Sequence, residues 1–244
     1  MKTTVLLSAA RHPVSGREAL ARLEAQAIAL ATRLGGDIRG LHAGPESDAL
    51  REALGVGLSK IDRIDAPNGS DPMEDLASHL RAAGPDLILA GRRGQGGLDS
   101  GLLPYRLAER LGLTLVADAI AIEAGSEAGT VRIDQALKKG DRRRVTVRLP
   151  VIVTVHPLAP PPAAFAYGAA RRGMISTHPV NDPIRQEGQG SEWEERPYRN
   201  RPKLMRTASA SSGDAAEKLF VDPDPKEAAR LILDYLERNG IRQF

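Results

Sequence analysis

The chain has 244 residues, of which 41% are hydrophobic and 27% charged, so we expect one large domain, or one domain with an appendage, around a sizeable core. Only 3% of the residues are aromatic and the formal net charge is +3, which argues against nucleic-acid binding through a basic surface with base-stacking side chains. The absence of cysteine excludes disulfides, iron–sulfur clusters and thiolate zinc sites in this chain.

Neither a targeting segment nor a membrane span is expected. The run from Met1 to Leu7 lacks the long apolar core of a signal peptide. No apolar run approaches the roughly 20 residues that a membrane helix needs. We therefore expect a cytoplasmic protein that is not embedded in a membrane.

Strand and helix patterns alternate in the first part of the chain. A β-prone run from Thr3 to Leu7 is followed by a helical stripe of apolar residues up to Leu34, and Ser15 with Glu18 predicts a capping box at the start of that helix. Further strands are predicted at 37–42, 61–64 and 87–90, with helices around 50–54, from Asp71 onward and at 103–111. This alternation predicts a Rossmann-like α/β fold, a parallel sheet with helices on both faces.

Small residues follow three of the predicted strands, in the turns 8–10 and 43–45 and the loop 91–100. The carboxyl ends of parallel strands form one edge where ligands bind, and a glycine loop before a helix is typical of an anion site. It is not a Walker loop, because no Gly-Lys-Ser/Thr closes it. Tight turns that simply favour small residues are the alternative. The candidate nucleotide contacts are Ser8, Ala9, Ala43, Gly44, Gly91, Gly94, Gln95, Gly96, Gly97, Asp99 and Ser100.

From Thr114 onward the pattern changes to strands without intervening helices, at 115–122, 130–136 and 144–156. A proline-rich segment, 157–173, follows and carries Phe165 and Tyr167. An aromatic pair on such a segment is either packed in the core or held out for a partner.

The end of the chain is predicted to form an arm. Residues 177–212 are polar and show no periodic pattern, and a compact domain rarely holds so long a loop without structure. The segment is disordered or lies on another subunit, and the only tryptophan, Trp193, favours the arm. A helix from Asp224 onward carries one apolar face, which must be buried on this domain or on a partner. We expect an α/β domain at 1–176 and an arm with a helix at 177–244.

No catalytic constellation is visible. The sequence has no His-Glu-x-x-His, no Gly-x-Ser-x-Gly and no histidine pair at ligand spacing. The histidines are scattered along the chain, at His12, His42, His79, His156 and His178. We therefore expect a protein that is not an enzyme.

Several segments together resemble the β subunits of electron transfer flavoproteins. The order and spacing of these segments match nearly to Val155, and the terminal helix fits as well. The matching segments are Ala43-Gly44-Pro45, Leu50 to Gly57, Asp86 to Gly91, Leu107 to Gly112, Arg132-Ile133-Asp134 and Leu149 to Thr154.

The resemblance implies a heterodimer with an α subunit, which would hold most of the FAD. The β subunit would help to form the FAD site and bury an AMP, although some members bind a second FAD there and bifurcate electrons. Electrons would pass from a flavin-dependent dehydrogenase to an acceptor of the quinone reductase type. The family's recognition loop corresponds to residues 160–173, so Phe165 or Tyr167 would serve as the docking anchor.

The sequence departs from the family at the phosphate loop. Members usually carry Gln-Ala-x-Asp-x-Asp-x-x-Gln-Thr/Val after the glycine that matches Gly91, whereas this chain has Arg93-Gly94-Gln95-Gly96-Gly97-Leu98-Asp99-Ser100. A divergent member is therefore expected. The alternatives are a homodimeric adenine-nucleotide-binding protein of the universal stress type and an enzyme that activates a substrate with ATP; the latter needs acidic magnesium ligands.

Overall fold

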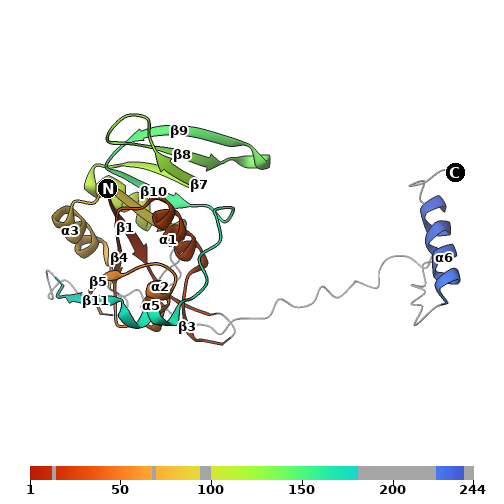
Figure 1. Cartoon of the computed structure of the whole chain (residues 1–244), viewed down its shortest axis with the longest axis horizontal. Coiled ribbons are helices and arrows are strands. Elements are labelled where there is room, and N and C mark those ends of the chain that lie inside the picture. The colour runs from red at the N-terminus through yellow and green to blue at the C-terminus, as the bar shows by residue number, and fades with distance from the viewer. Residues whose placement is uncertain (13–14, 68–69, 94–99, 181–223, 239–244) are drawn as a thin grey trace. The chain divides into compact units, whose positions relative to one another are not determined.

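In the computed structural model the chain forms two units, Met1–Arg196 and Pro197–Phe244 (Figure 1). A sheet of nine strands lies at the centre of the first unit. The structure describes residues 1–12, 15–67, 70–93, 100–180 and 224–238. The strands of the described part are β1 (Lys2–Leu7), β2 (Ala9–Arg11), β3 (Glu18–Leu20), β4 (Asp37–Ala43), β5 (Lys60–Ile64), β6 (Leu87–Gly91), β7 (Thr114–Ala124), β8 (Thr130–Ala136), β9 (Arg142–Arg148), β10 (Val151–Val155) and β11 (Met174–His178). The α-helices are α1 (Arg22–Leu34), α2 (Asp48–Gly55), α3 (Met73–Ala83), α4 (Leu103–Leu111), α5 (Tyr167–Arg172) and, in the second unit, α6 (Pro225–Arg238).

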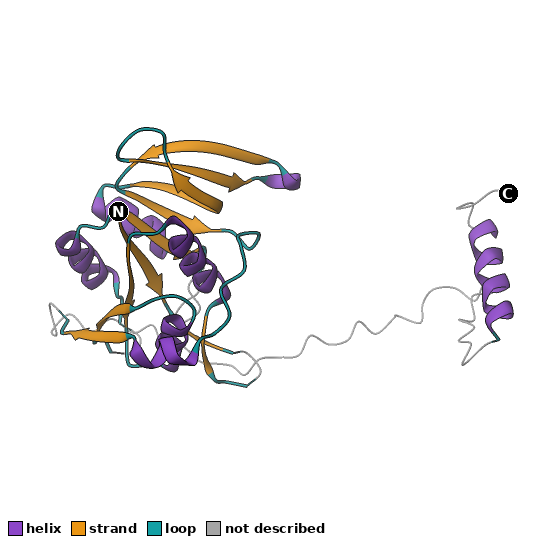
Figure 2. Cartoon of the chain, in the orientation of Figure 1, coloured by secondary structure: helices purple, strands orange, loops and turns teal. Residues whose placement is uncertain are grey.

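The strand order of the large sheet is β11-β5-β4-β1-β6-β10-β7-β8-β9. Neighbouring strands are parallel from β11 to β7, and β8 and β9 extend the sheet as an antiparallel meander (Figure 2). The predicted Rossmann-like fold with extra strands is therefore confirmed. None of the helices in the described ranges is both long and apolar enough for a membrane crossing.

Two apolar layers cover the two faces of this sheet. Val5 and Leu7 of β1 pack with α1 and α2, whereas Leu6 packs with α3 and α4. Figure 1 shows α1 and α3 on opposite sides of β1 accordingly. Successive side chains of a strand point to opposite faces, so a strand that is apolar throughout is buried on both.

The predicted helix starting near Asp71 is confirmed, with local chemistry that explains its ends. The Asp71 carboxylate accepts the N–H of Met73 at 3.1 Å, which satisfies a free donor of the first turn. The helix ends at Gly84, which adopts the left-handed conformation with φ of 56°.

The capping box predicted at Ser15 and Glu18 is wrong. Helix α1 begins at Arg22 behind Ala21, which makes no side-chain cap. Glu18 lies instead in β3, and its carboxylate accepts the N–H of Asp48 at 3.0 Å, so it serves the start of α2. The small-residue turn predicted after β1 also differs, because Ala9 and Ala10 begin β2 and pair with β3.

The sequence prediction missed α5 and β11. Strand β11 is exposed along much of its length and pairs with β5, more than a hundred residues earlier in the chain. Strand β11, Met174–His178, runs across the predicted boundary between the α/β domain, 1–176, and the arm, 177–244.

Candidate functional site

The candidate site lies at the carboxyl ends of β1 and β6, where the strand order reverses. Ligands of open α/β sheets bind at such a switch point. A cavity of about 50 Å³ opens there beside Ser8, which follows β1, and Gly91, which ends β6. Ser8 and Glu24 supply its polar lining, and the rest of the lining is apolar.

Glu24, in the first turn of α1, is a buried acid in this cavity, with only 3% of its surface exposed. Its carboxyl oxygens accept the backbone N–H of Ser8 at 3.0 Å and the Ser8 hydroxyl. Burial raises the pKa of Glu24 to about 8, although the hydrogen bonds from Ser8 act in the opposite direction. The group is therefore largely neutral at pH 7 and is able to donate a hydrogen bond.

The glycine loop begins and ends in close backbone approaches. A Cβ on Gly91 would lie 3.3 Å from the carbonyl oxygen of Arg93. Gly101 has a φ of 73°, and a Cβ there would lie 3.0 Å from the carbonyl oxygen of Arg92, so a glycine closes the loop with the least strain. The Arg92 guanidinium lies 3.5 Å from the Asp118 carboxylate of β7, which places a cation beside the loop.

The end of β4 forms the neighbouring part of the edge. His42 is paired in register with Leu7, and its Nδ1 lies 3.0 Å from the Leu7 carbonyl oxygen. Burial lowers the pKa of His42, so the imidazole is neutral and Nδ1 carries the proton that this oxygen accepts. Gly44 has a φ of 154°, and a Cβ there would lie 2.8 Å from Nε2 of His42. The predicted turn at 43–45 thus requires its glycine.

The structure brings some of the predicted contact residues together. Ser8 and Gly91 line one cavity, whereas Ala43 ends the adjacent strand β4, Gly44 follows it and Ala9 opens β2. The Ser100 hydroxyl accepts the N–H of Leu102 at 3.2 Å, just before α4. The predicted contacts Gly94, Gln95, Gly96, Gly97 and Asp99 lie outside the described residues.

Sequence reasoning missed Glu24 and the Arg92–Asp118 pair. A signal for Glu24 was available, because it lies one helical turn before Ile28, on the apolar stripe of α1, where an acid is out of place. Asp118 gave no such signal. It adopts a φ of 58° where the pairing between β7 and β10 shifts register, which only the assembled sheet reveals.

Comparison with known proteins identifies the family. The family model described as "Electron transfer flavoprotein domain" matches residues 14–183. A relative from Chromohalobacter salexigens, named electron transfer flavoprotein subunit beta, is 39% identical over 253 residues, which cover 97% of this chain and 94% of the relative. The chain belongs to the electron transfer flavoprotein β-subunit family. The resemblance seen in the sequence is confirmed, and the family is by name one of electron carriers rather than enzymes.

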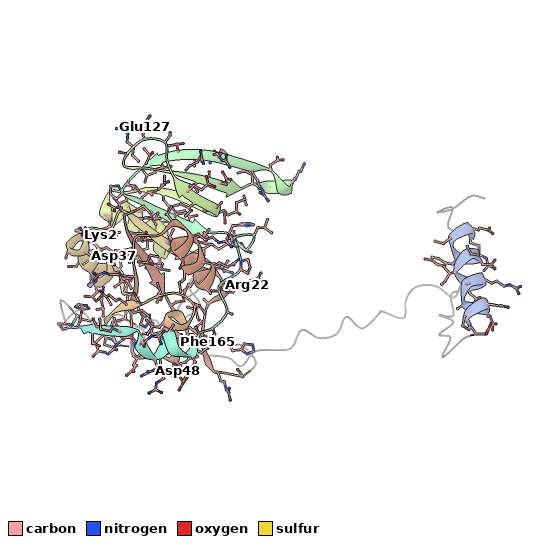
Figure 3. All side chains as sticks on the ribbon, viewed as in Figure 1. Lys2, Arg22, Asp37, Asp48, Glu127 and Phe165 are labelled. Atoms are coloured by element: carbon pink, nitrogen blue, oxygen red, sulfur yellow. The ribbon has the colours of Figure 1, made fainter. Side chains whose placement is uncertain are left out.

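In this electron transfer flavoprotein homologue the aromatic pair of segment 157–173 is held outward. Phe165 is 53% exposed and Tyr167 is 69% exposed. The backbone N–H of Ala166 donates to the carbonyl oxygen of Gly55 at 2.8 Å, and Figure 3 shows Phe165 beside α2 and α5. The guanidinium carbon of Arg171 lies 6.0 Å from the centre of the Tyr167 ring. This exposure excludes burial of the pair in the core.

Proposed function

We propose that this chain is the β subunit of a heterodimeric electron transfer flavoprotein and contributes walls and a docking surface rather than reactive groups. The observation that carries the proposal is the 39% identity to a subunit of that name over 97% of the chain. Redox chemistry belongs to the flavin when it is bound, whereas the residues of this chain position it and exclude water.

The size of the cavity supports an FAD held mainly by the α subunit. A drug-sized ligand needs a pocket of roughly 300–1,000 Å³. The cavity between Ser8 and Gly91 has about 50 Å³, so this cavity is too small to enclose a dinucleotide by itself. A site completed by a second subunit accounts for this shortfall.

The edge formed by Ser8, Ala43, Gly44 and Gly91 suits an adenine nucleotide such as AMP. Small residues let a flat base approach the backbone. Glu24 adds a neutral carboxyl that is able to donate to a ring nitrogen. A second FAD at this place would instead indicate a bifurcating member.

Residues 160–173 form the proposed docking segment for a flavin-dependent dehydrogenase, with Phe165 and Tyr167 as its anchors. Exposed aromatic side chains next to arginines are typical hot spots of interfaces. The electrons would then pass to an acceptor of the quinone reductase type. Residues 177–244 form the proposed arm, whose helix α6 grips the α subunit.

Co-expression with the cognate α subunit tests the proposal. We expect a stable pair with the visible absorption of a bound flavin, and mass analysis of the released nucleotides will identify what the β subunit holds. A colourless pair, or a β chain that forms a homodimer indifferent to the α subunit in gel filtration, would contradict it.

A further inference from the structure

Two of the scattered histidines meet one aspartate on the α3 face of the sheet. Asp62 lies on β5, His79 on α3 and His178 on β11. Nε2 of His178 is 3.2 Å from one carboxylate oxygen of Asp62, and Nε2 of His79 is 3.7 Å from the other. One ligand atom from each of the three residues lies within 4.8 Å of the other two.

The fold explains how residues so far apart in sequence converge. β11 runs parallel to β5 with Ser176 opposite Asp62 and His178 opposite Ile64, so Asp62 and His178 belong to the same face. Ile64 packs with Leu76 and Leu80 of α3, which brings His79 over that face. The two imidazole rings meet edge to face, with their centres 4.9 Å apart.

We propose that Asp62, His79 and His178 bind a divalent transition-metal ion, with Zn²⁺ as the best match. Two imidazoles and one carboxylate are a donor set that zinc accepts readily. With metal–ligand bonds of about 2.0–2.2 Å, neighbouring ligand atoms of a tetrahedral site lie about 3.3–3.5 Å apart. The 3.2 Å separation between His178 and one oxygen of Asp62 is close to this distance, whereas His79 lies 3.7 Å from the other oxygen. The three ligand atoms, now within 4.8 Å of one another, would have to approach by side-chain rotation around a bound ion.

The cavity beside Asp62 and His79 is lined by both basic and acidic side chains, among them Lys2 and Asp37. The nearby guanidinium groups already have counter-charges, since Arg39 lies 3.4 Å from Asp37 and Arg63 lies 2.7 Å from Asp65.

A cavity of about 150 Å³ borders Asp62 and His79 and has room for a water as the fourth ligand. Lys2 and Asp37, which also line this cavity, lie next to α3 in Figure 3.

The bound ion would fasten the edge strand. β11 is the outermost strand, and it pairs with β5 alone in the sheet. It follows α5 directly, after Gly173. A metal held by His178 and His79 adds a link from β11 to α3, so it stiffens the base of the segment that carries Tyr167. This inference is independent of the proposed flavoprotein function, because it rests on three residues outside that site.

Titration of the tag-free, EDTA-treated full chain with Zn²⁺ by calorimetry tests the site. We expect one equivalent to bind, and His178→Gln and His79→Gln each to weaken binding at least about tenfold. His156→Gln is the matched control, because His156 follows β10 at a distance from this face; it should bind Zn²⁺ like the parent chain. Circular dichroism without metal checks that each variant is folded, and the second histidine variant serves if the first is not.

Hydrogen exchange tests the proposed link. Zn²⁺ should slow exchange of the β11 amides, Met174–His178, and leave those of β8 unchanged. The proposal is overturned if the full chain binds no stoichiometric Zn²⁺, or if both histidine variants bind it as tightly as the parent. Equal slowing in β8 and β11 would overturn the fastening of β11.

Discussion

The ring of Phe165 lies against Gly55, so closely that a Cβ on Gly55 would be 2.2 Å from Cε2 of the ring. Because Gly55, at the end of α2, has no side chain, the exposed ring of Phe165 is able to pack against its backbone. The neighbouring backbone is fixed at the same place, because Ala166 donates to the Gly55 carbonyl oxygen at 2.8 Å. The position of the proposed docking anchor therefore depends on a glycine in another element.

Gly55→Ala should impair docking as Phe165→Ala does. The added methyl displaces the ring, which is free to move because it is half exposed, so we expect unfolding free energy to change by no more than about 1 kcal/mol. Both variants should slow reduction of the α–β flavoprotein by a donor dehydrogenase on the order of tenfold at limiting concentrations, the size typical of a lost hot spot. Stopped-flow absorbance of the flavin measures this rate.

Leu137→Ala is the control for that experiment, because Leu137 is also an exposed apolar residue, at 46%, but follows β8. It should leave the rate unchanged. Unaltered reduction of both the Gly55 and Phe165 variants would rule out this surface as the dehydrogenase contact.

Glu24→Gln should change how stability depends on pH. The folded-state pKa of Glu24, about 8, lies above the ordinary value of 4.5, so between these values the folded chain holds a proton that the unfolded chain has released. The stability supplied by this group is therefore full below about pH 4.5 and is lost as the pH rises toward 8. Glutamine carries a neutral amide at every pH. The free energy of unfolding of the variant should therefore rise by a few kcal/mol relative to that of the parent across this range.

Urea unfolding at several pH values between about 5 and 8 measures the difference. Glu46→Gln is the matched control, since the Glu46 side chain is 69% exposed, and its curve should run parallel to that of the parent. Parallel curves for Glu24→Gln as well would show that Glu24 is ionised in the folded chain.

Thr154→Val should destabilise the chain more than Thr154→Ser. The hydroxyl of Thr154, a residue with 1% exposure, accepts the backbone N–H of Asp118 at 3.0 Å, where β7 departs from regular pairing. Valine keeps the shape but leaves this N–H without its acceptor, at a cost of about 1–3 kcal/mol. Serine keeps the acceptor and loses one methyl group, worth about 0.8 kcal/mol. Urea unfolding compares the free energies of unfolding of the two variants. A larger loss of stability for the serine variant would refute the role given to the hydroxyl.

The sequence was sufficient for most of the sheet and for the helices on its two faces, because the patterns of these elements are local. The apolar run Leu87–Ala90 and the stripe of α1 reflect burial that each element shows by itself, and Gly84 and Gly112 mark helix ends through their own backbone conformation. The turns at Ser8, Gly44 and Gly91 could be placed on one edge because parallel strands share their carboxyl ends.

The remaining features depend on partners far along the chain. Gln26 of α1 donates to the carbonyl oxygen of Ala159 at 2.5 Å, so the segment after β10 contacts α1. The sequence of α1 alone does not reveal this contact. β11 is recognisable only beside β5, because an exposed edge strand has no apolar alternation of its own. Asp62 and His178 likewise gave no sign of proximity, because they lie far apart in the sequence and lack the short spacing that is typical of metal-ligand motifs.

Leu231→Glu in α6 should weaken association with the α subunit. Helix α6 carries Leu231, Ile232 and Tyr235 on one side, and Ile232 and Tyr235 are 60% and 63% exposed within its unit. A helix of this length is marginal in water unless its apolar face is buried, so the proposed partner has a clear energetic role. We expect a charge in this face to lower affinity for the α subunit by at least about tenfold. Arg230→Glu introduces the same side chain on the neighbouring polar side and should have little effect. Titration of each variant with the α subunit in analytical gel filtration compares them, and equal affinity of the Leu231 variant and the parent would exclude this face from the interface.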